Sequence, residues 1–128
     1  IKEIKKDTNG YFAIKRYIFM SKKKIVIINR KINYLVKSGS KVVIWGMGSL
    51  TARLLASTNL SKADIKFFVD NNKAMQGKKI NNIDIFPPSI LRKLNNDYKV
   101  FIGSYIYRNE IRDILVNEYK FKGEIISL

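Results

Sequence analysis

Two glycines and one acidic residue are the groups in this chain whose type and spacing point to chemistry. The stretch KVVIWGMGSLTARLLASTN, residues 41–59, begins as an apolar, β-branched run, breaks at Gly46 and Gly48, and resumes with apolar residues at helical spacing. In nucleotide-binding units of this form, the first glycine makes the tight turn, and the second lets the backbone approach phosphates at the helix N-terminus. The pattern therefore predicts a turn whose backbone amides can bind an anion.

An acid at the end of the following run fits the same chemistry. Asp70 stands 22 positions after Gly48, at the end of IKFFVD. A carboxylate about 20 residues on binds ribose hydroxyls in such units. The third glycine position holds Thr51, so the full fingerprint is not met. Two interpretations stay open: a site for a nucleotide or similar phosphorylated ligand, or a strand-to-helix turn followed by an ordinary Asx turn without a ligand.

The mouth of such a site forms at the carboxyl ends of parallel strands, where the strand order reverses. In this sequence, that rule brings residues 46–49 near residues 103–105. Ser104 either caps the last helix or donates to a ligand, and Tyr105 either stacks on a base or covers the end of the sheet. The predicted nucleotide-binding residues are Gly46, Met47, Gly48, Ser49, Asp70, Asn71, Ser104 and Tyr105.

No set of residues has the spacing of a catalytic site. The chain has no His and no Cys, which removes the commonest general base and every thiolate nucleophile or metal ligand. The one Tyr-x-x-x-Lys pair, Tyr11 and Lys15, precedes the glycine turn and falls in a predicted strand. We therefore predict no catalytic residue and no metal site, and we do not expect this chain to catalyse a reaction alone.

The elements that must position these residues alternate between strand and helix. Such alternation predicts right-handed βαβ units and an α/β, Rossmann-like, mainly parallel sheet with flanking helices over residues 41–128. Apolar residues at helical spacing predict a connecting helix over 22–37, with Gly39 as its C-terminal cap. Strands are predicted over residues 41–46, 65–70, 83–86, 99–104 and 124–128, and helices begin near residues 50, 89 and 107.

The first segment, residues 1–21, predicts a β-hairpin because Asn9-Gly10 separates two partly alternating runs. A two-stranded hairpin is marginal alone in water, so we expect it to pair with another part of the protein. The first residue is Ile, and we expect the chain to be a piece of a longer one. Residues 22–40 then form a connecting segment between the hairpin and the Rossmann-like domain.

The net charge of +15 raises the question of a nucleic-acid partner. The surplus is +9 in residues 1–40 and +6 in residues 41–128, and it consists of 19 Lys and 6 Arg against 10 acids. Base readout and bidentate phosphate contacts favour Arg over Lys. We interpret the charge as a solvated face, with a phosphate-rich polymer as the lesser alternative. No apolar run approaches the roughly 18 residues that span a bilayer, and we expect a cytoplasmic protein.

Three segments, taken in order, resemble the Rossmann-like domain that follows the catalytic domain in certain bacterial S-adenosylmethionine-dependent methyltransferases. These are the C-methyltransferase-like proteins of sugar and surface-polysaccharide modification. The segments are VVIWGMGSLTARLLASTNL, IKFFVDNNKAMQGKKINNIDIFPP and VFIGSYIYRNEI, and the resemblance covers about residues 40–128. The positions that match the family pattern are Trp45, Gly46, Gly48, Ser49, Asp70, Asn72, Gln76, Gly77, Lys78, Pro88, Tyr107, Glu110 and Ile111.

The resemblance implies an accessory domain that recognises the nucleotide or carbohydrate part of a substrate. Methyltransferase domains of this class finish in an antiparallel hairpin, so residues 1–21 would be the end of a missing catalytic domain, which would bind S-adenosylmethionine. The pattern also resembles, more loosely, the N-terminal domain of bacterial sugar O-acyltransferases. That likeness implies a nucleotide-sugar at residues 46–49 and Asp70, although the His that follows the glycine turn in many of those enzymes is absent here.

Three hypotheses follow. The first is an accessory module that binds a nucleotide or nucleotide-sugar and is joined to a methyltransferase domain. The second is a scaffold without a ligand that docks or dimerises the catalytic domain. The third is a stand-alone protein that binds NAD, for which the chain offers no convincing acid or base.

Overall fold

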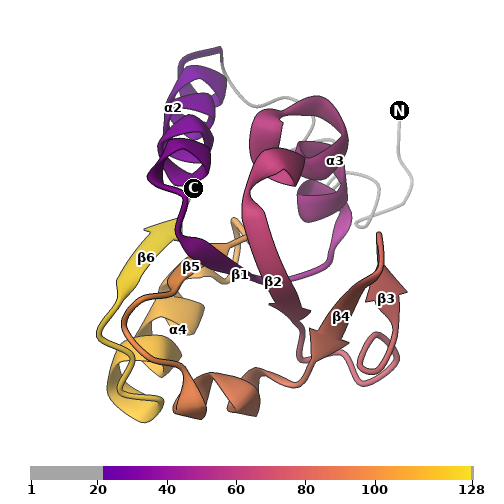
Figure 1. The fold of residues 1–128 in the computed structure, drawn as a ribbon, viewed down its shortest axis with the longest axis vertical. Coiled ribbons are helices and arrows are strands. Elements are labelled where there is room, and N and C mark those ends of the chain that lie inside the picture. The colour runs from indigo at the N-terminus through magenta and orange to yellow at the C-terminus, as the bar shows by residue number, and fades with distance from the viewer. Residues whose placement is uncertain (1–21, 128) are drawn as a thin grey trace, which may run out of the picture.

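The structure of the protein is a computed structural model that describes residues 22–127. The hairpin predicted over residues 1–21 lies outside the described residues. The described chain forms one sheet with helices on both sides (Figure 1), which confirms the predicted α/β class with a mainly parallel sheet. The strands are β1 (Lys41–Trp45), β2 (Asp64–Val69), β3 (Lys79–Ile80), β4 (Ile83–Phe86), β5 (Lys99–Ile102) and β6 (Glu124–Ser127).

The strand order reverses beside β1. The sheet runs β3-β4-β2-β1-β5-β6, with β3 antiparallel to β4 and the other neighbours parallel. The chain moves outward from β1 through β2 to β4, and then crosses back to place β5 on the other side of β1. Trp45 is paired with Val69 and with Ile102, so the residues that follow these three strands meet at one edge of the sheet.

The strand β1 is buried on both faces because helices cover both sides of the sheet. Its residues Val42 and Ile44 join one apolar cluster, while Val43 and Trp45 join the other. The helices α2 (Lys22–Ser38) and α3 (Ser49–Ser57) cover the first face. The helix α4 (Arg108–Asp113), the π-helical turn Ile114–Glu118 and the 3₁₀ helix Pro88–Lys93 cover the second.

The connecting helix ends as the sequence predicts. Gly39 has a φ of 66° and donates its amide to the carbonyl of Val36, as expected for a left-handed C-terminal cap. The apolar stripe of α2 packs through Ile28, Ile32 and Leu35. Ile25, which the periodicity assigns to the same stripe, is 45% exposed.

The structure adds two short elements, the 3₁₀ helix Asn59–Lys62 and the strand β3, and changes the form of two others. The region after Asp70 contains a short hairpin, β3-β4, where the sequence predicts only a polar loop before residue 83. Its two-residue connection, Asn81 and Asn82, has φ values of 51° and 64°, as in a hairpin turn with positive φ at both positions. The helix expected near residue 89 is a 3₁₀ helix, and the last helix continues as a π-helical turn.

The strands β1, β2 and β5 end one or two residues earlier than predicted, and β4 covers the predicted residues 83–86. Gly46 and Asp70 directly follow β1 and β2, and Gly103 follows β5. All three therefore belong to the loops at the carboxyl edge of the sheet, where a ligand can reach them. None of the helices in the described residues is long and apolar enough to cross a membrane.

Candidate functional site

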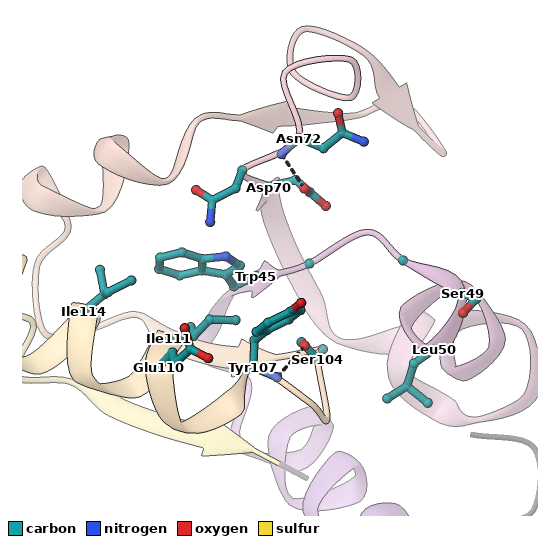
Figure 2. Close-up of a pocket in the computed structure, with 14 residues that line it drawn as sticks. Trp45, Ser49, Leu50, Asp70, Asn72, Ser104, Tyr107, Glu110, Ile111 and Ile114 are labelled. Atoms are coloured by element: carbon teal, nitrogen blue, oxygen red, sulfur yellow. Dashed lines mark hydrogen bonds between the residues drawn. The ribbon is translucent and has the colours of Figure 1, made fainter. Parts of the chain in front are cut away.

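A cavity of about 540 Å³ opens at the carboxyl ends of β1, β2 and β5. This is the point where the strand order reverses, and its volume falls within the range of about 300–1,000 Å³ typical of small-molecule sites. Figure 2 shows side chains from several elements converging on this space. The lining residues are Trp45, Gly46, Gly48, Ser49, Leu50, Asp70, Asn71, Asn72, Gly103, Ser104, Tyr107, Glu110, Ile111 and Ile114.

The turn after β1 is fixed to the end of β2 by hydrogen bonds. Gly46 has a φ of 107°, a conformation that side-chain-bearing residues rarely adopt, and its amide donates to the carbonyl of Val69 at 2.8 Å. The amide of Met47 donates to Oδ2 of Asp70 at 2.8 Å. The first glycine therefore makes the tight turn that the sequence predicts, and the next amide is already bonded within the protein.

Gly48 lies open to the cavity, and neither its φ nor its packing requires glycine. Its φ is −86°, which any residue adopts, and a Cβ added there would meet no protein atom within 4 Å. The missing side chain leaves room directly above the backbone at the start of α3. Space of this kind is what a phosphate requires when it approaches backbone amides.

The first turn of α3 supplies hydrogen-bond donors to this space. The amides of Gly48, Ser49 and Leu50 donate to no other group within residues 22–127, as is usual for the first turn of a helix. All three residues line the cavity. The aligned peptide dipoles of α3 add partial positive charge at the same place.

Asp70 combines the two interpretations that the sequence leaves open. Its Oδ1 accepts the amide of Asn72 at 2.8 Å, which is an Asx turn, and its Oδ2 holds the amide of Met47 (Figure 2 shows the Asn72 bond). The carboxylate is thus part of the framework of the loop. Each carboxylate oxygen has a second lone pair, so Asp70 can still accept a ligand hydroxyl from the cavity side.

A buried hydroxyl joins the loops that follow β1 and β5. Thr51 is fully buried, and its Oγ1 donates to the carbonyl of Gly46 at 2.6 Å and lies 3.4 Å from that of Gly103. A Cβ on Gly103 would lie 2.1 Å from the Thr51 Oγ1. In the full fingerprint the third glycine allows close helix-to-strand packing. Here Gly103, directly after the neighbouring strand β5, provides the close approach, which explains why Thr51 can occupy the third position.

Ser104 starts the turn that leads into α4. Its Oγ accepts the amide of Tyr107 at 3.1 Å, the residue that precedes the helix. The hydroxyl hydrogen of Ser104 remains available to a ligand, since Ser104 also lines the cavity.

Two of the predicted site residues lie away from the cavity. The side chain of Met47 packs against the core beneath α2 and α3. Tyr105 accepts a hydrogen bond from Nζ of Lys24 at 2.9 Å and lies under the guanidinium of Arg108, 4.1 Å from the ring centroid. The hydrogen bond from Lys24 lowers the pKa of Tyr105, and the charge of Arg108 adds to this. Neither side chain is in the cavity lining, whereas Gly46, Gly48, Ser49, Asp70, Asn71 and Ser104 are.

One wall of the cavity was not among the predicted site residues. The side chains of Trp45, Tyr107, Glu110, Ile111 and Ile114 form it. The indole of Trp45 is only 3% exposed and stacks on Tyr119, with centroids 6.1 Å apart and an interplanar angle of 16°. The π-helical turn begins at Ile114 and turns this side chain toward the cavity, and single π-helical turns are frequent at functional sites.

The cavity holds no arrangement of metal ligands. Within residues 22–127, no group of three acidic or other metal-ligating side chains comes together. Among residues 22–127, the lining contains two carboxylates, Asp70 and Glu110, and no Lys or Arg. The arrangement suits recognition by hydrogen bonds and shape.

One protein family matches this chain. A family model described as C2185-like, N-terminal, matches residues 38–126, which include all of the sheet except Ser127 and every residue that lines the cavity. No curated protein matches the chain.

Proposed function

We propose that this chain, which belongs to the C2185-like, N-terminal family, is a module that binds a nucleotide or a nucleotide-sugar. The phosphate would lie over Gly48 and accept the amides of Gly48, Ser49 and Leu50. The carboxylate of Asp70 would accept a hydroxyl of the ribose or sugar. The chain would act by recognition, with chemistry performed by another domain.

The observation that carries this proposal is the open space above Gly48. Gly46 is needed for its positive φ and Gly103 for its contact with Thr51, but neither conformation nor packing explains Gly48. Glycine is also among the residues favoured at a helix N-cap, but here it leaves open the space beside three amides that donate to no group within residues 22–127, in a cavity at the strand-order reversal, as a phosphate ligand would require.

The biological setting rests on the resemblance of residues 40–128 to the accessory domain of sugar and polysaccharide methyltransferases. We propose that the module is joined to such a catalytic domain in the cytoplasm. The methyltransferase domain would bind S-adenosylmethionine, and this module would hold the nucleotide or sugar part of the substrate.

Calorimetric titration of the chain tests the proposal directly. The panel contains UDP-, dTDP- and GDP-sugars, NAD and S-adenosylmethionine. Heat from one or more nucleotide-sugars, lost in Gly48→Ala, is the expected result. A response to NAD alone would favour a nicotinamide-binding protein, and silence with every compound would reject the proposal.

A scaffold without a ligand is the second candidate. The start of α2 exposes three consecutive apolar residues, Ile25, Val26 and Ile27, at 45%, 50% and 42%. Such a patch is typical of a surface that docks another domain or a second copy. Light scattering of the chain and of Val26→Glu would test this role, since a dimer through this patch would dissociate in the variant.

A further inference from the structure

The chemical class of the ligand can be inferred from the two ends of the cavity, and this inference rests on the proposed function. The cavity has two ends made of different groups, and Figure 2 shows them on opposite sides of the space. The amide end consists of Gly48, Ser49 and Leu50, at the start of α3. The ring end consists of Trp45, Tyr107, Glu110, Ile111 and Ile114.

The ring end contains a buried donor that has no acceptor within residues 22–127. Trp45 is only 3% exposed, and its indole N–H donates to no group within residues 22–127. Figure 2 shows the indole nitrogen on the ring edge that faces the loop of Asp70 and Asn72, across the cavity. Buried indole N–H groups usually have a hydrogen-bond partner, so this donor indicates an acceptor that enters the cavity.

The charges at the ring end do not suit a phosphate. The carboxylate of Glu110 lines this end, and no Lys or Arg within residues 22–127 does, in a chain with 25 Lys and Arg against 10 acids. The two arginines of α4 bond elsewhere: Arg108 to the carbonyl of Tyr105, and Arg112 to Oγ of Ser127 at 2.8 Å. A phosphate placed here would face a like charge without a partner.

We infer that the ring end takes an uncharged, hydroxyl-bearing ring, and that Trp45 and Glu110 select it. The indole N–H donates to a ring or hydroxyl oxygen, and the carboxylate of Glu110 accepts a hydroxyl hydrogen. The apolar side chains Ile111 and Ile114 contact the carbon face of the ring. The ring is the ribose of a nucleoside or the hexose of a nucleotide-sugar, while the phosphate stays at the amide end.

A single resonance reports on this inference. Trp45 is the one Trp in the chain, so an amide–proton NMR spectrum of the ¹⁵N-labelled chain contains one indole signal. The probes are UDP-glucose, uridine, glucose 1-phosphate and inorganic pyrophosphate. We expect UDP-glucose to shift the indole signal downfield together with the amides of residues 48–50. Pyrophosphate should shift those amides alone. Uridine and glucose 1-phosphate distinguish a ribose from a hexose as the ring that moves the indole.

Two variants complete the test. Glu110 is exposed, so Glu110→Gln leaves folding unchanged, and it should weaken the binding of UDP-glucose about tenfold without weakening that of pyrophosphate. Glu118→Gln is the matched control, because Glu118 is an exposed acid on the following turn, paired with Arg92 outside the cavity.

The outcomes separate the inference from the proposed function. If no probe shifts any signal, the proposed function fails, and this inference fails with it. If UDP-glucose shifts the amides of residues 48–50 and leaves the indole signal in place, the proposed function stands and the inference is overturned. Unchanged affinity of Glu110→Gln would overturn the assignment of Glu110.

Discussion

The two glycines of the turn after β1 should respond in opposite ways to the same substitution. Gly46 has a φ of 107°, and Gly48 has a φ of −86°. Replacement of either glycine by Ala adds one methyl group, at positions only two residues apart. Gly46→Ala should therefore cost stability, and Gly48→Ala should cost binding.

The magnitudes follow from the backbone conformation and the space around each glycine. A Cβ on Gly46 would meet Gly103 at 3.7 Å, an ordinary contact, so its cost is conformational and amounts to about 1–2 kcal/mol. Gly48→Ala restricts the unfolded chain, which stabilises by about 0.4–1 kcal/mol. It also replaces a favourable N-cap residue, which costs about 0.5–1 kcal/mol. These two terms cancel to within about 0.5 kcal/mol.

Urea unfolding measures the first effect, and calorimetry with UDP-glucose measures the second. We expect Gly46→Ala to lower the free energy of unfolding, and Gly48→Ala to leave it unchanged within about 0.5 kcal/mol. We expect Gly48→Ala to weaken the ligand at least about tenfold, because the new methyl group occupies the space through which the phosphate reaches the amides.

The reasoning would be refuted by a Gly48→Ala protein that binds UDP-glucose as tightly as the wild type. It would also be refuted by Gly48→Ala losing as much stability as Gly46→Ala, because Gly48 would then have a structural role.

Three further predictions concern stability. Thr51→Val removes the hydroxyl that bonds the carbonyl of Gly46 and should lower the free energy of unfolding, measured in urea, by about 1–2 kcal/mol. Thr51→Ser keeps the hydroxyl and should lose less than half of that amount. Asp70→Ala removes the acceptor of the Met47 and Asn72 amides and should cost about 2 kcal/mol, with faster hydrogen exchange at both amides; unchanged exchange would contradict the assigned bonds. The hydrogen bond from Lys99 lowers the pKa of Glu124 below 4.5, and that from Tyr34 adds to this. Because the pKa is lowered on folding, the stabilisation is complete above the unfolded value and is lost as pH falls through the folded value. Melting temperatures measured below pH 4.5 should therefore fall more steeply in the wild type than in Glu124→Gln, and parallel curves would exclude the contribution.

The sheet could be predicted from the sequence because its central strands are strongly patterned. β1 and β5 are short apolar runs with glycine at their ends, and burial on both faces makes such runs recognisable. β3 is only two residues long, which is too short for any alternation to register. Its turn residues Asn81 and Asn82 were the available signal, since Asn tolerates positive φ.

The floor of the candidate site could be predicted from the spacing of its residues. The wall residues Trp45, Tyr107, Glu110 and Ile111 match the family pattern, but their spacing did not predict them as site residues. Gly46, Gly48 and Asp70 have a spacing that follows from strand and helix geometry. Tyr107 and Ile111 lie on an apolar helical stripe that has the same period as any core-facing stripe. Only the three-dimensional structure shows that this stripe continues past the edge of the sheet and lines open space.

The side-chain directions of Met47 and Tyr105, which neighbour the site residues in the chain, could not be predicted from the sequence pattern either. Met47 lies between two cavity-lining glycines, and Tyr105 follows Ser104, yet both side chains turn to the opposite side of the sheet. Loop residues have no fixed alternation, so adjacency in the chain does not predict a shared direction.

The Thr51 hydroxyl has a consequence for how the mouth of the cavity behaves over time. It contacts both loops that face each other there, and because it is fully buried, solvent does not compete for these contacts. The contact between the two loops at the cavity mouth therefore forms on folding, before any ligand binds. A ligand therefore meets a preformed entrance, and none of its binding energy is needed to reorder these loops. Selection among ligands then depends on shape and charge complementarity.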